Sequence, residues 1–249
     1  EFQNVIPPTG VTNGGTAQNW KSDEGTWDYT IPFDFPYYGV NYDQLRISSN
    51  GTVLFGNTGN ANWYKPEWTT KAVIPSALLA AGSGVINNKI YMAGGNLNGS
   101  ILSKLYVYDP TNNSWDTTKA SMPTARHSTV TGVINGKLYV AGGKSSGSCN
   151  PSNKLEEYNP PTDTWTIKAS LSEARLGGMG GAYNGKLYYL SGVTCGSTNS
   201  STMEVYDAAT DAWETKSVPS GIQRFHSAAS AFLDGKLYVA GGQNGYGNH

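Results

Sequence analysis

The sequence predicts an all-β fold made of short antiparallel strands and tight turns, and two observations carry this prediction. Glycine accounts for 31 of the 249 residues and aromatic residues for 12%, a composition typical of strands and turns rather than helices. A unit of about 48 residues also recurs from residue 68 onward. The net charge of −1, from 17 basic and 18 acidic residues, argues against a nucleic-acid-binding protein, which usually carries an electropositive surface.

Each repeat predicts two β-hairpins that form one four-stranded sheet. A two-residue turn such as Asn135-Gly136 supplies the positive φ angles that a tight hairpin demands, and a strand of the type Lys-Leu-Tyr-Val-Ala follows it. A double glycine comes next, and a third strand ends in a tyrosine with a tryptophan seven residues later. The glycine positions are Gly94-Gly95, Gly142-Gly143, Ser191-Gly192 and Gly241-Gly242, and the aromatic pairs are Tyr108/Trp115, Tyr158/Trp165 and Tyr206/Trp213.

Such a sheet is expected to be one blade of a β-propeller, because its two apolar faces are buried only when neighbouring blades stack on them. Glycines allow the inner strands to approach closely, and the tyrosines and tryptophans fill the space between blades. The double glycine, tyrosine and tryptophan at this spacing resemble the kelch repeat over roughly residues 68–243. The resemblance implies kelch-type β-propeller blades. The sequence departs from the pattern at Ser191, which replaces a glycine, and at Leu78, where the other repeats have arginine.

The number of predicted strands does not complete a ring. Three full blades are expected at roughly 78–119, 126–168 and 175–216, whereas the last unit, 224–243, has only two strands. The chain's own strands near Trp68 could complete the last unit, the chain could be part of a longer propeller, or a neighbouring subunit could supply the missing strands. Because an open strand edge is a template for pairing, we expect it to be capped in cis or in trans. The candidate strands in this chain are those around Thr52–Phe55 and Trp68–Lys71.

The first 67 residues lack the repeat and predict a separate N-terminal β segment, followed by the propeller repeats at 68–249. Alternating apolar and polar residues predict a strand at Trp27–Phe35, and further strands are expected at Leu45–Ile47 and Thr52–Phe55. The stretch Ile31–Gly39, together with the Ser-Ser-Asn-Gly that ends at Gly51, resembles a β-sandwich motif of secreted microbial surface proteins. The segment is therefore either sandwich-like or a source of blade-completing strands.

Several features favour an extracellular or cell-surface location. The low content of charged residues, 14%, accompanies four Asn-x-Ser/Thr sequences that are candidates for N-glycosylation. No run of 18 apolar residues occurs, so no transmembrane segment is predicted. The first residue is glutamate, which is consistent with a processed form, a fragment or a cloned segment. The candidate glycosylation sites are Asn50, Asn98, Asn112 and Asn199.

An arginine recurs at the start of the first strand of a repeat, and two hypotheses explain it. The arginines could ring one mouth of the propeller, with the neighbouring histidines, and bind a carboxylate or other anion. Alternatively, a repeat-wide arginine braces neighbouring loops or blades. The residues are Arg126, Arg175 and Arg224, with His127 and His226 beside two of them.

Catalysis has little support in the sequence, and neither a metal nor another cofactor is expected. The chain has only three histidines, with no ligand spacing. Paired carboxylates could act on sugars, but Glu156 and Glu157 are adjacent on a strand and point to opposite faces. We expect these carboxylates, with Glu173 and Glu204, on a solvated outer strand. Kelch enzymes that resemble galactose oxidase bind copper through a Tyr/His set, which the context of the two cysteines does not match.

The function that the sequence favours is that of a secreted, non-catalytic propeller protein in surface adhesion, ligand binding or self-assembly. The partner would be a protein or a glycan at a propeller face, or further copies of the chain joined by strand or blade completion. Exposed Trp63 and Tyr64 could offer a platform on which a glycan stacks. A carbohydrate-active enzyme or a copper oxidase is the alternative.

We predict that Cys149 and Cys195 form one disulfide. Both residues follow the inner glycine-ended strand in corresponding loops of adjacent blades, and equivalent loops emerge on the same face. The alternative is two unpaired loop thiols. Mass spectrometry of the non-reduced protein after alkylation should show an unmodified chain, and two alkylated cysteines would contradict the prediction.

Overall fold

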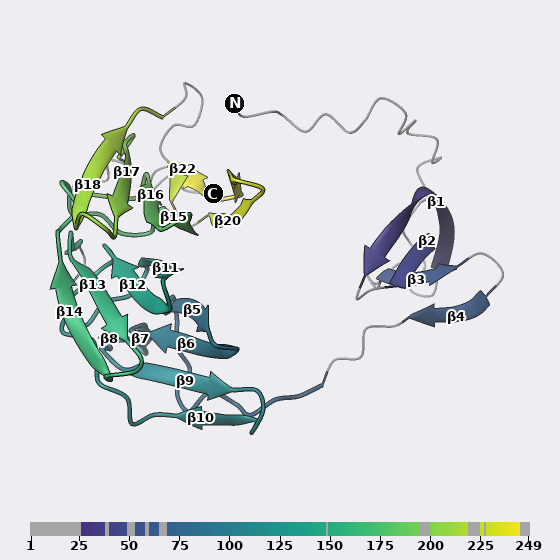
Figure 1. Ribbon diagram of the computed structural model, residues 1–249, viewed down its shortest axis with the longest axis horizontal. Coiled ribbons are helices and arrows are strands. Elements are labelled where there is room, and N and C mark those ends of the chain that lie inside the picture. The colour runs from purple at the N-terminus through teal and green to yellow at the C-terminus, as the bar shows by residue number, and fades with distance from the viewer. Residues whose placement is uncertain are drawn as a thin grey trace. The chain divides into compact units, whose positions relative to one another are not determined.

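The computed structural model describes residues 26–37, 40–48, 53–57, 60–64, 69–147, 149–194, 200–218, 225–226 and 228–244. The described residues contain strands and turns and no helix, which confirms the predicted all-β class (Figure 1). The chain divides into two compact units, Glu1–Thr70 and Lys71–His249, whereas the sequence predicts a boundary after residue 67.

The first unit contains one four-stranded antiparallel sheet in which strands that follow one another along the chain are neighbours. The β1–β2 register shifts between Thr30 and Phe35, a stretch that contains Pro32, which has no N–H to donate to the ladder. β3 pairs with β2 on one edge and with β4 on the other. The strands are β1 (Thr26–Tyr37), β2 (Val40–Ser48), β3 (Val53–Asn57) and β4 (Asn60–Tyr64).

The second unit contains three complete four-stranded sheets, which confirms the three predicted blades. The first consists of β5 (Gly82–Ile86), β6 (Lys89–Ala93), β9 (Leu105–Asp109) and β10 (Ser114–Asp116), with a small hairpin, β7 (Asn96–Leu97) and β8 (Ser100–Ile101), after the double glycine. The second consists of β11 (Val130–Ile134), β12 (Lys137–Ala141), β13 (Leu155–Asn159) and β14 (Thr164–Lys168). The third consists of β15 (Met179–Tyr183), β16 (Lys186–Leu190), β17 (Met203–Asp207) and β18 (Ala212–Lys216).

The turns between the first two strands of each blade have the predicted geometry. Asn135 and Gly136 have φ angles of 50° and 73°, and Asn184 and Gly185 have 47° and 72°. Both residues of a tight hairpin loop need positive φ, which asparagine and glycine adopt at low cost. These local sequences therefore set the register of the first two strands of their blades.

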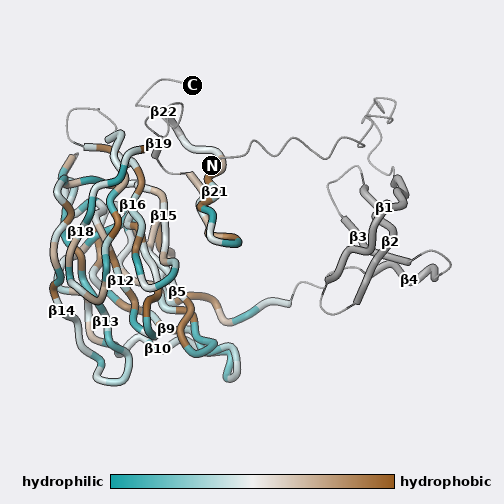
Figure 2. Tube along the Cα trace, turned by 45° about the horizontal axis from the view of Figure 1, so that its top comes forward, coloured by the Kyte–Doolittle hydropathy of each residue, from teal (hydrophilic) through white to brown (hydrophobic). Residues whose placement is uncertain are grey.

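Neighbouring blades stack through their inner strands, and this stacking forms the core. Strands β5, β11, β15 and β20 (Ala229–Leu233) lie side by side (Figure 1). Hydrophobic residues, brown in Figure 2, recur along the strands of all three blades. The two core clusters contain residues from successive blades: one joins Ile86 and Tyr91 to Leu138, and the other joins Ile134 and Tyr139 to Leu187.

A repeated polar unit attaches each outer hairpin to the connector that enters its blade. In the second blade, Trp165 Nε1 donates to the carbonyl of Ala120 at 2.9 Å. Asp163 Oδ1 accepts from Ala120 N at 3.0 Å and from the Tyr158 hydroxyl at 2.7 Å. The same bonds occur in the other blades, through Trp115, Tyr108, Asn113 and Ala72, and through Trp213, Tyr206, Asp211 and Ala169.

The last unit is a two-stranded hairpin, β20 with β21 (Lys236–Ala240). A separate short pair joins β19 (Phe225–His226) to β22 (Gln243–Asn244). Within the described residues β21 pairs only with β20, whereas β6, β12 and β16 pair on both edges. In the described residues neither segment proposed for capping in cis is a free strand: Val53–Phe55 is part of β3, which is paired on both edges, and residues 69–71 form no strand, so capping in trans stays a prediction. Trp68 lies outside the described residues.

We predict that Gly132→Ala destabilises the protein, because Gly132 is where the second blade meets the third. A Cβ at Gly132 would lie 2.6 Å from the Ala182 Cβ and 2.8 Å from the Ala182 backbone nitrogen, so the neighbouring strand would have to move. Overpacking of this kind costs about 1–3 kcal/mol, measurable as a lower free energy of unfolding in urea.

The matched control is Ala231→Val, at the equivalent strand position of the last unit. Ala231 is exposed, so the change should alter the free energy of unfolding by no more than about 0.5 kcal/mol. An equal decrease in the free energy of unfolding in the two variants would contradict the role assigned to Gly132.

Candidate functional site

Arg126 and Arg175 are each held inside a blade by a set of hydrogen bonds. Both side chains are 0% exposed. The Arg126 Nη1 donates to the carbonyls of Gly142 and Lys154, at 2.7 and 2.9 Å, and its Nη2 lies 2.8 Å from Glu156 Oε2. Burial lowers the pKa of Arg126, and the attraction of Glu156 opposes this effect.

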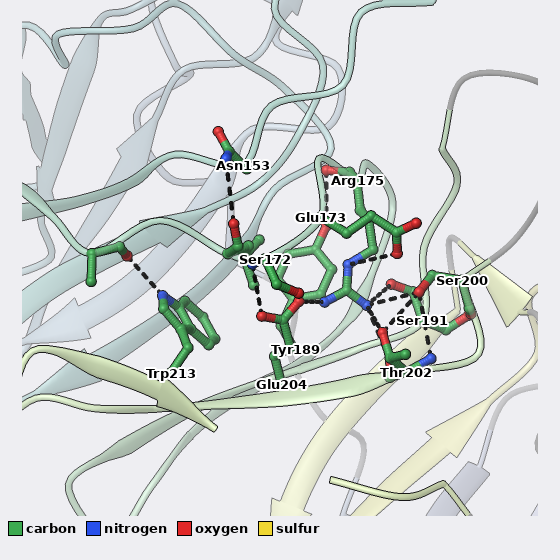
Figure 3. A network of polar contacts seen from close by, with 12 residues as sticks. Asn153, Ser172, Glu173, Arg175, Tyr189, Ser191, Ser200, Thr202, Glu204 and Trp213 are labelled. Carbon is green, nitrogen blue, oxygen red and sulfur yellow. Dashed lines mark hydrogen bonds and ion pairs between the residues drawn. The ribbon is translucent and has the colours of Figure 1, made fainter. Parts of the chain in front are cut away.

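The Arg175 site repeats this arrangement in the third blade (Figure 3). Its Nη2 bonds to Glu204, and its Nη1 donates to the carbonyls of Ser191 and Thr202, each at 3.1 Å. The guanidinium carbon also lies 4.8 Å from the centre of the Tyr189 ring, within the range of a cation–π interaction.

The backbones of these arginines join successive blades. The carbonyl of Arg126 accepts from Gly95 N at 2.9 Å, and the carbonyl of Arg175 accepts from Gly143 N at 2.8 Å. Each arginine therefore bonds to the double glycine of the preceding blade through its main chain and fills its own blade through its side chain.

The anion-ring hypothesis requires a correction for Arg126 and Arg175. Neither guanidinium is available to a ligand, because each is buried and engaged by a carboxylate and by carbonyls. The arrangement is the bracing of neighbouring loops and blades. Arg224 lies outside the described residues, and the side chain of His226 is likewise not described. His127 Nδ1 lies 2.9 Å from Ser128 Oγ, and burial together with Lys144 lowers the pKa of His127.

The expectation that the carboxylates lie on a solvated outer strand is also wrong. Glu156, Glu157 and Glu204 are buried on the third strands of their blades, and Glu173 is half-exposed but lies in a bend between β14 and β15. Glu156 and Glu157 do point to opposite faces, since Glu157 bonds to Lys137 and Tyr139 instead of Arg126. Burial raises the pKa of Glu157, but the hydrogen bonds from Lys137 and Tyr139 outweigh it, so the net shift is downward.

The inner strands of the second unit line a groove that sequence reasoning missed. The groove has a volume of about 400 Å³ and lies along β5, β11, β15 and β20. Its walls are hydroxyl groups, glycine backbone and apolar side chains, and none of its lining residues is charged. The signal that could have revealed it is the small hydroxyl-bearing residue in second place on three of the four inner strands, Ser83, Thr131 and Ser230.

The remaining predicted sites fall partly outside the described residues. Cys149 is described but Cys195 is not, so their pairing stays a prediction. Asn98 and Asn112 are exposed, whereas Asn50 and Asn199 lie outside the described residues. The side chains of Trp63 and Tyr64 are not described. In the described residues no group of three or more His, Cys, Asp or Glu side chains is placed to hold a metal ion. The described part of the chain contains no helix that could span a membrane.

Comparisons with known proteins identify the repeat. A family model described as the KLHDC2/KLHL20/DRC7 Kelch-repeats domain matches residues 39–246. Beta-scruin of Limulus polyphemus is 34% identical over 103 residues, which cover 34% of this chain. The match covers 11% of beta-scruin, so the chain spans only a small part of that relative's length. The structure of YjhT superposes with a TM-score of 0.64 at 19% identity, covering 86% of this chain and 73% of the YjhT chain, and shows a shared fold.

We predict that Glu204→Leu destabilises the third blade strongly, because it leaves the buried charge of Arg175 without its carboxylate. Removing one partner of a buried ion pair costs about 3–5 kcal/mol. The double variant Arg175→Met/Glu204→Leu should be less destabilised than Glu204→Leu alone, since no uncompensated charge remains. Urea unfolding followed by tryptophan fluorescence measures both.

The control for this prediction is Glu214→Leu, which removes the carboxylate of the exposed pair Lys216–Glu214 on β18. Exposed pairs contribute at most about 1 kcal/mol. If Glu204→Leu lowers the free energy of unfolding no more than Glu214→Leu does, the buried pair is not a structural brace.

Proposed function

Since the family match spans residues 39–246, the chain belongs to the kelch-repeat family, and we propose that it is a non-catalytic module for binding and assembly. One observation supports assembly. At the two ends of the blade array, apolar side chains are exposed at the positions that are buried wherever two blades meet. The buried carboxylates Glu156 and Glu204 brace the blades, which supports a role that depends on surfaces rather than on catalysis.

The contact between two blades follows one rule. Leu138 and Val133 of the second blade cover Gly84 of the first, and Leu187 and Ala182 of the third cover Gly132 of the second. Leu138 and Leu187 are both 0% exposed as a result. A following blade therefore contributes an apolar pair, and the preceding blade receives this pair over a glycine.

The corresponding positions at the two ends are uncovered. On the first blade, Val85 and Ile90 are equivalent to Val133 and Leu138, yet they are 62% and 39% exposed. On the last unit, Leu233 and Tyr238 are equivalent to Ile134 and Tyr139, yet they are 61% and 44% exposed. We call Val85 and Ile90 the start face, and Leu233 and Tyr238 the end face.

Most of the large hydrophobic side chains that are exposed in the described residues belong to the two ends of the blade array. Among the described residues eight large hydrophobic side chains are exposed, and six of the eight belong to the first blade or its entry and to the last unit. Val85 and Ile90 lie directly opposite each other on β5 and β6, and exposed apolar residues that adjoin in this way are typical of an interaction site. The six are Val73, Leu79, Val85, Ile90, Leu233 and Tyr238.

The proposed partner of the end face is the start face of a second copy of this chain. The two surfaces correspond to the two halves of a contact that the chain makes between its own blades, except that the end face has Ala231 where the preceding blade has Gly84 or Gly132, so the added copy would sit slightly farther away. The edge of β21, which has no strand partner among the described residues, lies beside the end face and can pair with an added strand. Such a head-to-tail contact generates a ring if it closes and a filament if it does not.

The wider setting is an extracellular surface, where such assembly would serve adhesion and where loops at a propeller face would bind a protein or glycan. The exposed asparagines Asn98 and Asn112, each in an Asn-x-Ser sequence, are accessible to glycosylation and support this setting. Detection of glycan at these two asparagines on protein from its native source is the corresponding test.

We predict that the purified chain self-associates with increasing concentration in sedimentation velocity experiments. Ile90→Lys and Leu233→Lys should each abolish association, because each places a charge in an apolar contact. A mixture of the two variants should form dimers and nothing larger, since Ile90→Lys retains the end face and Leu233→Lys retains the start face.

The matched control is Ile167→Lys on the outer strand β14, where the side chain is 60% exposed and away from both end faces. This variant should associate like the unaltered chain. A chain that stays monomeric at every concentration, or an equal effect of Ile167→Lys, would refute the assembly proposal.

A further inference from the structure

The second residue of each inner strand has backbone groups that point into the groove. Ser83, Thr131 and Gly180 face Met92, Val140 and Tyr189, respectively, across the ladder. In an antiparallel hairpin with a two-residue turn, the pair that flanks the turn is hydrogen-bonded, and hydrogen-bonded and non-hydrogen-bonded pairs alternate from there. Counted from the turn, Ser83, Thr131 and Gly180 all belong to non-hydrogen-bonded pairs. The N–H and C=O of these three residues therefore point away from the second strand, toward the free inner edge.

At two of the three junctions a hydroxyl from the following blade satisfies both groups. Thr131 Oγ1 accepts from Ser83 N at 3.3 Å and donates to Ser83 O at 2.7 Å. Ser230 Oγ accepts from Gly180 N at 2.9 Å and donates to Gly180 O at 3.0 Å. We call this double hydrogen bond the hydroxyl clamp.

The middle junction lacks the clamp. The residue that would clamp Thr131 is Gly180, which has no side chain, and in the described part of the chain no other residue bonds to the Thr131 N–H or C=O. Gly180 has a φ of 148°, and a Cβ there would lie 1.9 Å from the carbonyl oxygen of Tyr188. The backbone therefore requires glycine at this position and leaves the Thr131 groups open.

A second unpartnered group lines the same groove. The Thr129 hydroxyl oxygen is buried and has no hydrogen-bond partner in the described residues. Buried hydroxyl groups are normally bonded, so this one is open to an acceptor or donor other than the described residues. The groove volume of about 400 Å³ lies within the range of small-molecule sites.

We propose that this groove binds a neutral, hydroxyl-rich ligand of the size of a sugar ring. One ligand hydroxyl repeats the clamp on Thr131, accepting from its N–H and donating to its C=O. A second ligand hydroxyl bonds to Thr129. The lining carries no charge, which favours a neutral ligand over an anion, because a buried charge needs a partner. The site is independent of the association of the two ends.

The test is a titration of the ¹⁵N-labelled chain with methyl β-D-glucopyranoside and, in parallel, its galactose counterpart. Saturable shifts should be largest at the amide of Thr131 and smaller at the amides of Ser83 and Gly180, which are already clamped. Methyl β-D-glucuronide, which carries a carboxylate, should bind more weakly. Absence of saturable shifts up to the solubility limit, shifts confined to other residues, or tighter binding of the glucuronide would overturn the proposal.

Thr129→Val should weaken binding of the neutral glycoside about fivefold, the effect of losing one net hydrogen bond. The change keeps the side-chain shape, and the hydroxyl that it removes bonds to no described residue, so folding should be retained. The matched control is Thr166→Val, which removes an exposed hydroxyl on the outer strand β14 and should leave binding unchanged. Equal effects of the two variants, or no effect of Thr129→Val, would contradict the assigned site.

Discussion

The contact between neighbouring blades is the constraint on which the rest of this structure depends. A four-stranded blade has two apolar faces and is too thin to bury either by itself. The chain meets this need with glycine on one face, as at Gly132, and a branched side chain on the next blade, as at Leu187. Because the same surfaces repeat along the array, the contact that holds the blades together also defines what is left exposed at the two ends.

The polar groups of the repeat also hold neighbouring blades together. Arg126 and Arg175 join the double glycine of one blade to the interior of the next, and their charges are matched by Glu156 and Glu204. The tryptophan of each outer hairpin donates its N–H to the connector that enters the blade. The charges of these arginines and carboxylates are thus paired inside the blades, whereas the groove along the inner strands presents backbone and hydroxyl groups.

The groove along the inner strands and the two ends of the blade array therefore differ in physical character. The ends are apolar, with Val85 and Ile90 exposed at one end and Leu233 and Tyr238 exposed at the other. The groove is polar and uncharged, and at Thr131 it offers both a donor and an acceptor within one residue. A single backbone requirement, glycine at position 180, creates this opening.

The repeat, the three full blades and their hairpin turns were predictable from the sequence, because strand order and turn geometry depend on local residues such as Asn135-Gly136. The sequence also showed that Arg126 and Arg175 recur in step with the blades. It did not show that both are buried, because burial depends on which residue of a distant strand meets them, here Glu156 and Glu204. The hydroxyl-lined groove likewise brings together Ser83, Thr131 and Ser230, which come from different blades. Local sequence thus determined the blades, whereas only their packing decided which polar groups are satisfied and which remain open.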